Sequence, residues 1–274
     1  MSNTNWAAGL NKIKGFSALT QLLLINGTVF LVGNIMASLL HNNILDYLMF
    51  PSRLTEFPAK FYTPITYMFA HVDLSHAFFN MIYLYFMGQI FASILGEKRL
   101  WFVYIMGGIA GAAFFLLLFN IFFAGAPAYL LGASAAVTAV AVACAVYAPN
   151  MPVTLFFFGT FKLKWVVLVW FLLSTALDLS INTGGKVAHL GGAIFGLMYA
   201  VQLKKGNDWM HVFSFNFLKK RKSAKVYKMK NTQQAKIANE EKTLNELLDK
   251  INKSGYDSLS KQEKEILQKI AAKK

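Results

Sequence analysis

Residues 127–148, PAYLLGASAAVTAVAVACAVYA, decide what kind of fold this chain adopts. The run carries no charged side chain, and it is long enough to cross a bilayer, because a spanning helix needs about 20 apolar residues. Ser134 stands inside it, in the hexapeptide LGASAA at 131–136. A polar side chain at membrane depth is costly, so this serine is a candidate functional residue.

The rest of the chain is also strongly apolar. Hydrophobic residues make up 56% of its 274 residues, 25 of them are phenylalanines, and the mean hydropathy is +0.44. This composition predicts a membrane protein with several spans. The single cysteine, Cys144, offers no disulfide framework, and we expect no cofactor and no resident metal.

Six stretches have the length and composition of membrane spans. They are 21–40, 75–95, 101–124, 127–148, 163–179 and 187–203. The fifth is the weakest, because Asp178 ends it early. The predicted fold class is therefore all-α, a polytopic bundle of six transmembrane helices followed by a soluble helical tail.

The positive charges are concentrated beyond the last apolar run. Of 27 Lys and Arg residues, 18 follow residue 203. By the positive-inside rule, this bias predicts that both termini are cytoplasmic. Basic clusters such as 219–222 attract anionic lipid head groups, and their place beside a span argues against a nucleic-acid partner.

The tail has helical periodicity of its own. Leu244, Leu247 and Leu248 follow helical spacing, and Ser260 with Glu263 has the pattern of a capping box that begins a second helix. The apolar face of that second helix would carry Ile266, Leu267 and Ile270. The predicted organisation is a cytoplasmic segment 1–20, a transmembrane domain 21–203, a basic linker 204–240 and a helical hairpin 241–274.

Two connecting segments are rich in aromatic residues. The segment 41–70 holds seven aromatic rings and three prolines, and it is either a piece lying in the membrane interface or an ordinary connecting loop. The stretch 153–158 is a candidate for a short interfacial piece.

A histidine in the last span has the right chemistry to activate Ser134. A serine hydroxyl is a weak nucleophile until a base takes its proton, and histidine is the usual base. His189 shares one helix face with Gly192 and Gly196, a G-x-x-x-G pair that favours close helix packing, so the imidazole points into the bundle. The two residues can meet if the fourth and sixth spans pack together.

Acyl transfer also needs donors for the developing oxyanion. His76 and Asn80 are spaced i and i+4 and project from one face of the second span, and the backbone N–H of Ser134 could add a further donor. His71 precedes this pair by five residues. No acidic residue lies near His189 in sequence, which favours a Ser–His dyad without a carboxylate.

Each of these residues also has a plainer interpretation. A serine in a membrane helix often bonds to its own backbone, and Asn80 could join two helices. The three histidines at 71, 76 and 189 could bind a metal, although no HExxH pattern accompanies them. A small transporter or channel could use the histidines as a proton relay, although the chain shows no internal repeat.

Taken together, the motifs resemble the rhomboid family of intramembrane serine proteases over about residues 20–203. The segment 71–81, HVDLSHAFFNM, is similar to the second helix of that family. The turn 96–99, GEKR, resembles a glutamate-containing turn before the third helix. The triplet 132–134, GAS, and the segment 188–192, AHLGG, with Gly196, are similar to the nucleophile motif and the sixth helix.

The resemblance implies a role for each matching residue. Ser134 is the implied nucleophile, His189 the implied base, and His76 with Asn80 the implied oxyanion donors. The implied fold is a six-helix bundle with a water-filled cavity open to the outside. Three features depart from the family pattern. The Trp-Arg pair that some members carry in the first loop is absent here, and two single positions differ. Ala135 stands where glycine commonly follows the serine, and Thr138 stands where some members have a tyrosine that supports the histidine, so that support must come from elsewhere.

The resemblance implies an intramembrane serine endopeptidase in a bacterial inner membrane. Its partners would be the lipid bilayer and transmembrane substrates whose helices unwind easily. The alternative is a catalytically inactive rhomboid-like protein that binds or escorts membrane helices. The tail around 254–259 resembles extensions of rhomboid-like proteins of the Bacteroidetes group.

Overall fold

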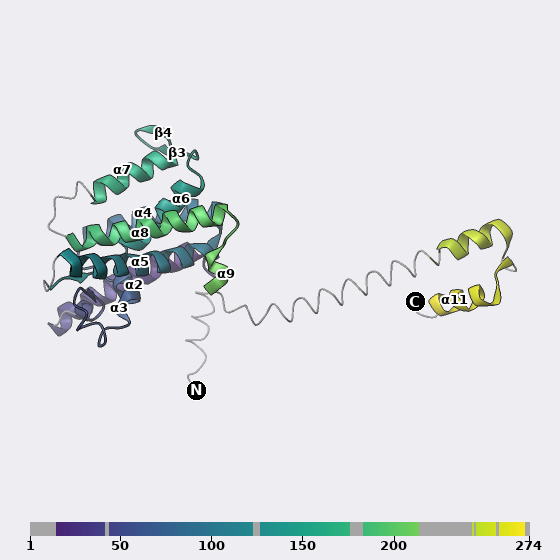
Figure 1. Cartoon of the computed structure of the whole chain (residues 1–274), viewed down its shortest axis with the longest axis horizontal. Coiled ribbons are helices and arrows are strands. Elements are labelled where there is room, and N and C mark those ends of the chain that lie inside the picture. The colour runs from purple at the N-terminus through teal and green to yellow at the C-terminus, as the bar shows by residue number, and fades with distance from the viewer. Residues whose placement is uncertain are drawn as a thin grey trace. The chain divides into compact units, whose positions relative to one another are not determined.

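The computed structural model describes residues 15–41, 44–122, 127–175, 183–213, 243, 245–255 and 258–271, and the chain divides into two compact units. The first unit is Met1–Met210 and the second is His211–Lys274. The long helices of the first unit are α2 (Ala18–Leu40), α4 (Leu74–Leu95), α5 (Glu97–Phe122), α6 (Ser134–Tyr147), α7 (Leu163–Thr175) and α8 (Thr183–Lys204). Figure 1 shows them as a bundle of roughly aligned helices.

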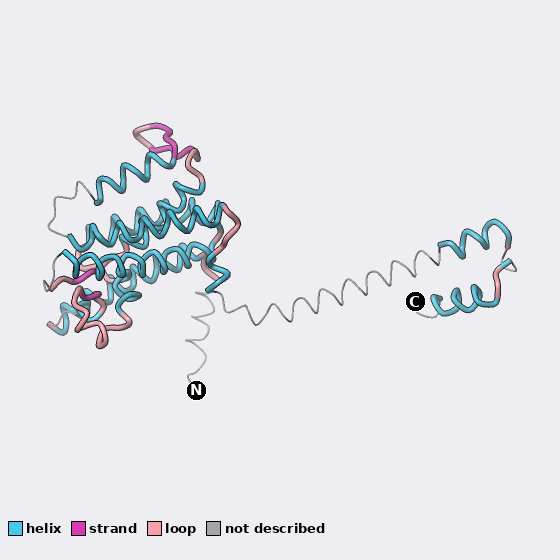
Figure 2. Tube along the Cα trace, viewed as in Figure 1, coloured by secondary structure: helices cyan, strands magenta, loops and turns pink. Residues whose placement is uncertain are grey.

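Short elements connect these helices. They are the 3-10 helices η1 (Ile44–Tyr47) and η2 (Tyr67–Phe69), the helices α3 (Thr63–Thr66) and α9 (Trp209–Phe213), and the strands β1 (Phe50–Pro51), β2 (Tyr129–Leu130), β3 (Pro152–Leu155) and β4 (Gly159–Lys162). The strands form two antiparallel pairs, β1 with β2 and β3 with β4. Figure 2 shows the β3–β4 hairpin at the edge of the helix bundle.

Three helices in the described part of the chain, α2, α4 and α5, are long and apolar enough to cross a membrane. The apolar helices α6 and α7 are shorter, with 14 and 13 residues. The long helices lie in the six predicted regions, but the count of six spans stays a prediction. Asp178, which was expected to end the fifth span, lies outside the described residues.

The predicted start of the fourth span is wrong. The helix begins at Ser134 and not at 127, because β2 occupies part of the preceding stretch and Gly132 adopts φ +105°. A positive φ in this range is favourable for glycine and cannot continue a right-handed helix. Ser134 is therefore at the end of a helix, where its backbone N–H is not committed to the helix itself.

Helix α6 lies at the centre of the first unit, and its close neighbours meet it through small residues. A methyl group on Gly111 of α5 would lie 2.6 Å from the Ala135 Cβ. Gly192 and Gly196 of α8 lie directly against the carbonyls of Ala135 and Ala139. Small residues allow helix backbones to approach closely where lipid provides no hydrophobic force between helices. The close packing predicted for the G-x-x-x-G pair is thus confirmed.

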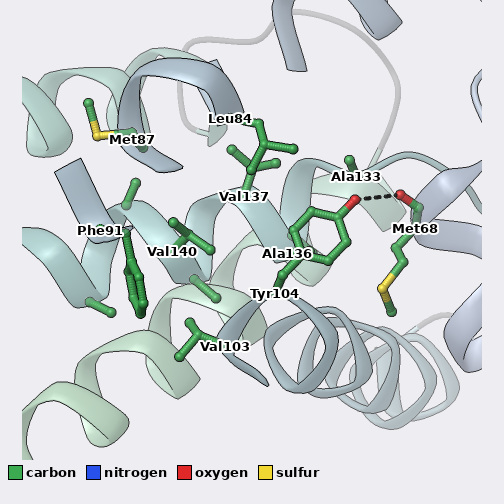
Figure 3. Packing of buried hydrophobic residues seen from close by; sticks show 14 of the residues in the cluster. Met68, Leu84, Met87, Phe91, Val103, Tyr104, Ala133, Ala136, Val137 and Val140 are labelled. Atoms are coloured by element: carbon green, nitrogen blue, oxygen red, sulfur yellow. Dashed lines mark hydrogen bonds between the residues drawn. The ribbon is translucent and has the colours of Figure 1, made fainter. Parts of the chain in front are cut away.

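The core around α6 combines these small residues with larger side chains. Figure 3 shows Val137 and Val140 of α6 among Leu84 and Phe91 of α4. The buried Tyr104 hydroxyl donates a hydrogen bond to the Met68 carbonyl at 3.1 Å (Figure 3), and it accepts one from the Asn26 amide at 3.0 Å. A buried polar group needs such partners, and these two hydrogen bonds connect α5 to η2 and to α2.

The aromatic segment 41–70 divides between core and surface. The rings of Phe50 and Tyr67 are buried, whereas those of Tyr47 and Phe61 are exposed. The Tyr67 hydroxyl donates to the Gly108 carbonyl at 2.7 Å, and β1 pairs with β2 just ahead of α6. The segment is therefore attached to the bundle at several points, and its strand β1 pairs with the strand that precedes α6.

One polar cluster closes the opposite end of the bundle. The Arg99 guanidinium pairs with the Asp208 carboxylate at 2.9 Å, and the Tyr199 hydroxyl donates to the same carboxylate at 3.3 Å. The Glu97 side chain accepts a hydrogen bond from the Ala18 backbone N–H. These contacts join α2, α5 and the end of α8.

The second unit contains helical residues 245–254 and the helix α11 (Lys261–Ala271). The predicted capping box is confirmed, because the Ser260 N–H donates to Glu263 Oε2 at 2.8 Å and the Glu263 N–H donates to Ser260 Oγ at 3.3 Å. Lys250 pairs with Glu263 at 2.8 Å, and its ammonium group, with the Ser260 N–H, lowers the pKa of that carboxyl to about 2. Leu247, in the first helical stretch, and Leu259, in the connection before α11, are buried.

Candidate active site

The chain ahead of Ser134 is held by two backbone hydrogen bonds. The Gly132 N–H donates to the Tyr67 carbonyl at 2.9 Å, and the Ala133 N–H donates to His71 Nε2 at 3.2 Å. The first bond inside α6 then runs from the Val137 N–H to the Ala133 carbonyl. The N–H groups of the first helical turn point out of the helix end, which makes the region around Ser134 attractive to negative charge.

His76 lies directly over Gly132. A methyl group on Gly132 would lie 2.6 Å from Cε1 and 3.0 Å from Nε2 of the His76 ring. Glycine is thus required here twice, for its positive φ and for the room that the imidazole takes. The structure therefore brings the predicted His76 within two residues of the predicted nucleophile.

Asn80 lies one turn further along α4 and is buried, with 8% of its surface exposed. Its amide nitrogen donates to the His76 backbone carbonyl at 2.8 Å. An amide carries two N–H donors, so this bond uses one and leaves the second for another acceptor. In the described structure Asn80 therefore has a helix-stabilising contact beside its predicted role.

His189 approaches the same region from α8. Gly192 meets Ala135 and Gly196 meets Ala139, so α6 and α8 run parallel and in step. His189 comes three residues before Gly192, so its side chain lies on the face of α8 that contacts α6, near the start of α6.

Thr175 is a site residue that the sequence did not reveal. Its hydroxyl oxygen lies 3.3 Å from Nδ1 of His189, at the last residue of α7. Some rhomboid-type sequences have a tyrosine in place of Thr138 to support the imidazole. Here the contact with the imidazole comes from Thr175. No sequence signal pointed to Thr175, because it comes from a helix end far from both motifs.

The comparisons with known proteins point to one family for the first unit. The family model of the rhomboid domain matches residues 58–206, more than half of the chain. The chain belongs to the rhomboid family. Together with its long apolar helices, this makes it a membrane protein.

A plant relative supports the assignment. RHOMBOID-like protein 12, mitochondrial, from Arabidopsis thaliana is 27% identical over 219 residues, which cover 73% of this chain and 62% of that protein. The chain thus spans less than two thirds of the relative's length. Residues 231–273 match a separate family of unknown function (DUF6576), and this match covers the helices of the second unit.

His71 has a distinct place in this rhomboid domain. It lies in the connection before α4, its side chain is fully buried, and its ring centroid is 5.2 Å from that of His76. Burial and, to a smaller extent, the neighbouring His76 lower its pKa to about 4, so the ring is neutral near pH 7. Because Nε2 accepts the Ala133 N–H, the ring proton is on Nδ1.

Ala135, which departs from the common rhomboid motif, is accommodated by its neighbours. Its methyl group lies against Gly111 of α5, and its carbonyl lies against Gly192 of α8. The extra methyl is therefore directed toward α5, where Gly111 provides the room that it needs.

The three histidines were also considered as metal ligands. Among the described residues, no three His, Cys, Asp or Glu side chains gather closely enough to hold a metal ion. His71 and His76 lie together, but the arrangement that unites them with Ser134 is the start of α6 and not a ligand set.

Proposed function

We propose that this rhomboid protein is an intramembrane serine endopeptidase with a Ser134–His189 dyad. The observation that carries the proposal is the meeting of three segments at the start of α6. His76 lies over Gly132, and Gly192 of α8 lies against Ala135, so Ser134 stands between the two contacts. Segments far apart in sequence thus meet at Gly132 and Ala135, on either side of Ser134 in the chain.

In the proposed reaction the Ser134 hydroxyl attacks the scissile carbonyl while His189 Nε2 takes its proton. Thr175 supports this step from the opposite side of the ring, because its oxygen faces Nδ1 at 3.3 Å. With the Nδ1 proton directed to Thr175, Nε2 carries the lone pair that a general base needs. The same nitrogen then protonates the leaving amine, and water releases the acyl group from Ser134.

The oxyanion would form at the N-terminal end of α6. The Ser134 backbone N–H is a donor there, and the helix end adds a favourable field. The His76 ring and the second N–H of the Asn80 amide are the side-chain donors proposed beside it. Each donor of this kind contributes about 10²–10³-fold to the rate in serine proteases.

The proposed substrates are transmembrane helices. A regular helix holds its carbonyls in hydrogen bonds, so a cleavable substrate must unwind near the cleavage site. Helix-breaking or small residues lower the cost of unwinding. We also propose that both termini are cytoplasmic, which places the basic loops and the tail on the inner side.

Cleavage by purified protein in vesicles tests the proposal. A fluorescent single-span substrate is incubated with the native chain, Ser134→Ala, His189→Ala and the control Ser93→Ala. The Ser93 hydroxyl donates to the Ile90 carbonyl of its own helix. We expect cleavage by the native chain and the control, and a loss of about 10³-fold or more in the two site variants. A serine-directed phosphonate should label Ser134 in the native chain and in the control, and neither of the two site variants should be labelled.

The outcome that contradicts the dyad is activity that survives either site substitution. Binding of the substrate by a native chain that does not cleave it would favour the alternative function, a rhomboid-like protein that escorts membrane helices. Binding is measured in the same vesicles by energy transfer between labelled substrate and protein.

A further inference from the structure

The β3–β4 hairpin carries the most exposed large apolar side chains in the described part of the chain. Phe156, Phe157 and Phe158 form its tip, with exposed fractions of 92%, 86% and 76%. These values exceed those of the outer faces of the long helices, where exposed leucines reach 70%. Three adjacent rings of this kind form an apolar patch that water does not favour.

The hairpin is amphipathic along its strands. Val153 pairs with Phe161, and Thr154 pairs with Thr160 through hydroxyls 2.9 Å apart. Side chains alternate between the two faces of a strand, so one face is apolar and the other carries the threonines. Val153 packs against the bundle core, so the apolar face begins on the bundle and continues outward to the tip.

The start of α7 indicates the depth of the hairpin relative to the membrane, because α7 begins immediately after β4. Trp165 in the first turn of α7 is half exposed, and the Lys164 ammonium lies 5.2 Å from its ring. Tryptophan and lysine side chains together are typical of the membrane–water boundary. The outer face of α7 then continues with Leu168, Val169 and Leu172, which are exposed as lipid-facing residues are.

The local charge is complementary to a lipid surface. Lys162 closes β4 and Lys164 follows it, and no acidic residue stands in the sequence between Glu97 and Asp178. Figure 1 shows the hairpin beside α7 at the outer edge of the helix bundle, on the side away from α2. An aromatic tip beside uncompensated lysines at the edge of a bundle fits a bilayer with anionic head groups.

We propose that the β3–β4 hairpin is an interfacial membrane anchor. Phe156–Phe158 enter the acyl region of the leaflet at the N-terminal end of α7, and Lys162 and Lys164 bind anionic lipid head groups. The anchor holds the connection between α6 and α7 in the plane of the membrane. It is a role separate from peptide-bond cleavage and does not depend on the proposed protease activity.

Spin labels on the full-length chain in vesicles test the anchor. Phe157→Cys carries the label at the tip, and Phe158→Cys provides a second site. Leu172→Cys is the lipid reference and Lys205→Cys is the water reference, since both side chains are exposed on known parts of the first unit. The native chain measures background labelling, because Cys144 is buried.

We expect the tip labels to collide with oxygen as often as the Leu172 label does and at least several-fold less often with a water-soluble nickel complex than the Lys205 label. Equal nickel access at the tip and at Lys205 would overturn the anchor. Protection from both reagents would show that protein covers the tip. Dipolar broadening that disappears on dilution with unlabelled chain would then identify a second copy, and that result also overturns the proposal.

Vesicle composition tests the lysines. In labelled chains that keep Lys162 and Lys164, adding phosphatidylglycerol to phosphatidylcholine vesicles should move the tip labels deeper into the membrane. The shift should be lost in the double variant Lys162→Gln and Lys164→Gln and retained in Lys253→Gln, a lysine of the second unit. An unchanged depth in both lipids would refute the head-group contact.

Discussion

Helices α6 and α7 are nearly equal in length and both are apolar, yet they occupy opposite environments. Ten of the 14 residues of α6 are buried, whereas only Leu163 and Val167 of the 13 residues of α7 are buried. Helix α6 is rich in alanine, and α7 consists largely of leucine, valine, tryptophan and phenylalanine. Of these two helices, therefore, the one with the smaller side chains is the one in the core.

The physical reason is the solvent. Lipid tails are as apolar as leucine, so bulky side chains gain little by leaving lipid for the protein interior. Close contact between backbones is what distinguishes the interior, and glycine and alanine permit it. Hydrophobicity alone cannot tell which of α6 and α7 is buried in the bundle, but side-chain volume can.

The largest expected effect comes from adding volume where α8 meets α6. Gly192→Leu would force a side chain against the Ala135 backbone, which cannot rotate away. We expect the free energy of unfolding to fall by about 3 kcal/mol. Equilibrium unfolding in mixed SDS and mild-detergent micelles measures it.

Gly27→Leu in α2 is the matched control, because a Cβ added there has no neighbouring atom within 4 Å. Its effect should stay within about 0.5 kcal/mol. Equal destabilisation by the two substitutions would break the contrast between a tightly packed centre and an open periphery.

The next effect concerns the buried histidine beside α6. The pKa of His71 is about 4 in the folded chain against 6.5 for a free side chain. Between these two pH values the unfolded chain binds a proton at His71 more readily than the folded chain does. The contribution of His71 to the free energy of unfolding is therefore fully present above about pH 6.5 and falls as the pH drops toward 4. We expect a loss of about 1 to 3 kcal/mol over this interval, measured by unfolding at several pH values.

His71→Gln should flatten that pH dependence, because a glutamine oxygen can still accept the Ala133 N–H but does not titrate. His41→Gln, in the exposed turn after α2, should retain the full slope. An unchanged slope in His71→Gln would show that another group carries the acid sensitivity.

A smaller effect should come from the contact of α7 with the proposed active site. Thr175→Val removes the hydroxyl that faces His189 Nδ1, and we expect kcat to fall about 3- to 10-fold with KM unchanged, the equivalent of one hydrogen bond. The pH–rate profile should shift on the histidine limb. Ser174→Ala, the neighbouring hydroxyl that bonds to Phe171, should match the native chain in both readouts.

The smallest expected effect concerns the attachment of α7 to α4. Trp170 stacks on Tyr83 with ring centroids 4.3 Å apart, and such a pair contributes about 0.5–1.5 kcal/mol beyond its buried area. Trp170→Leu should lower the free energy of unfolding by about that amount. Trp165→Leu, on the exposed side of the same helix, should have no measurable effect on unfolding, and a larger effect there would reverse our assignment of the two faces.

Much of the architecture followed from local patterns. The apolar runs indicated the regions of the long helices, the pair Ser260 and Glu263 indicated a capping box that the hydrogen bonds confirm, and the G-x-x-x-G pair indicated close packing. The start of α6 did not follow, because an apolar run does not distinguish helix from a short strand and a positive-φ glycine. Ser134 is at a helix end only because Gly132 breaks the run.

The sequence by itself determined that this chain is an apolar, membrane-embedded rhomboid protein with candidate residues Ser134, His189, His76 and Asn80. The apolar spans follow from composition, and the family and its candidate residues follow from the resemblance of short motifs; both are local features of the chain. Only the tertiary structure decided that α6 and α8 run in step, that His71 holds the chain ahead of Ser134, that Thr175 faces His189, and that three phenylalanines project from a hairpin. These are contacts between distant segments, and they depend on how whole helices pack, which no local period encodes.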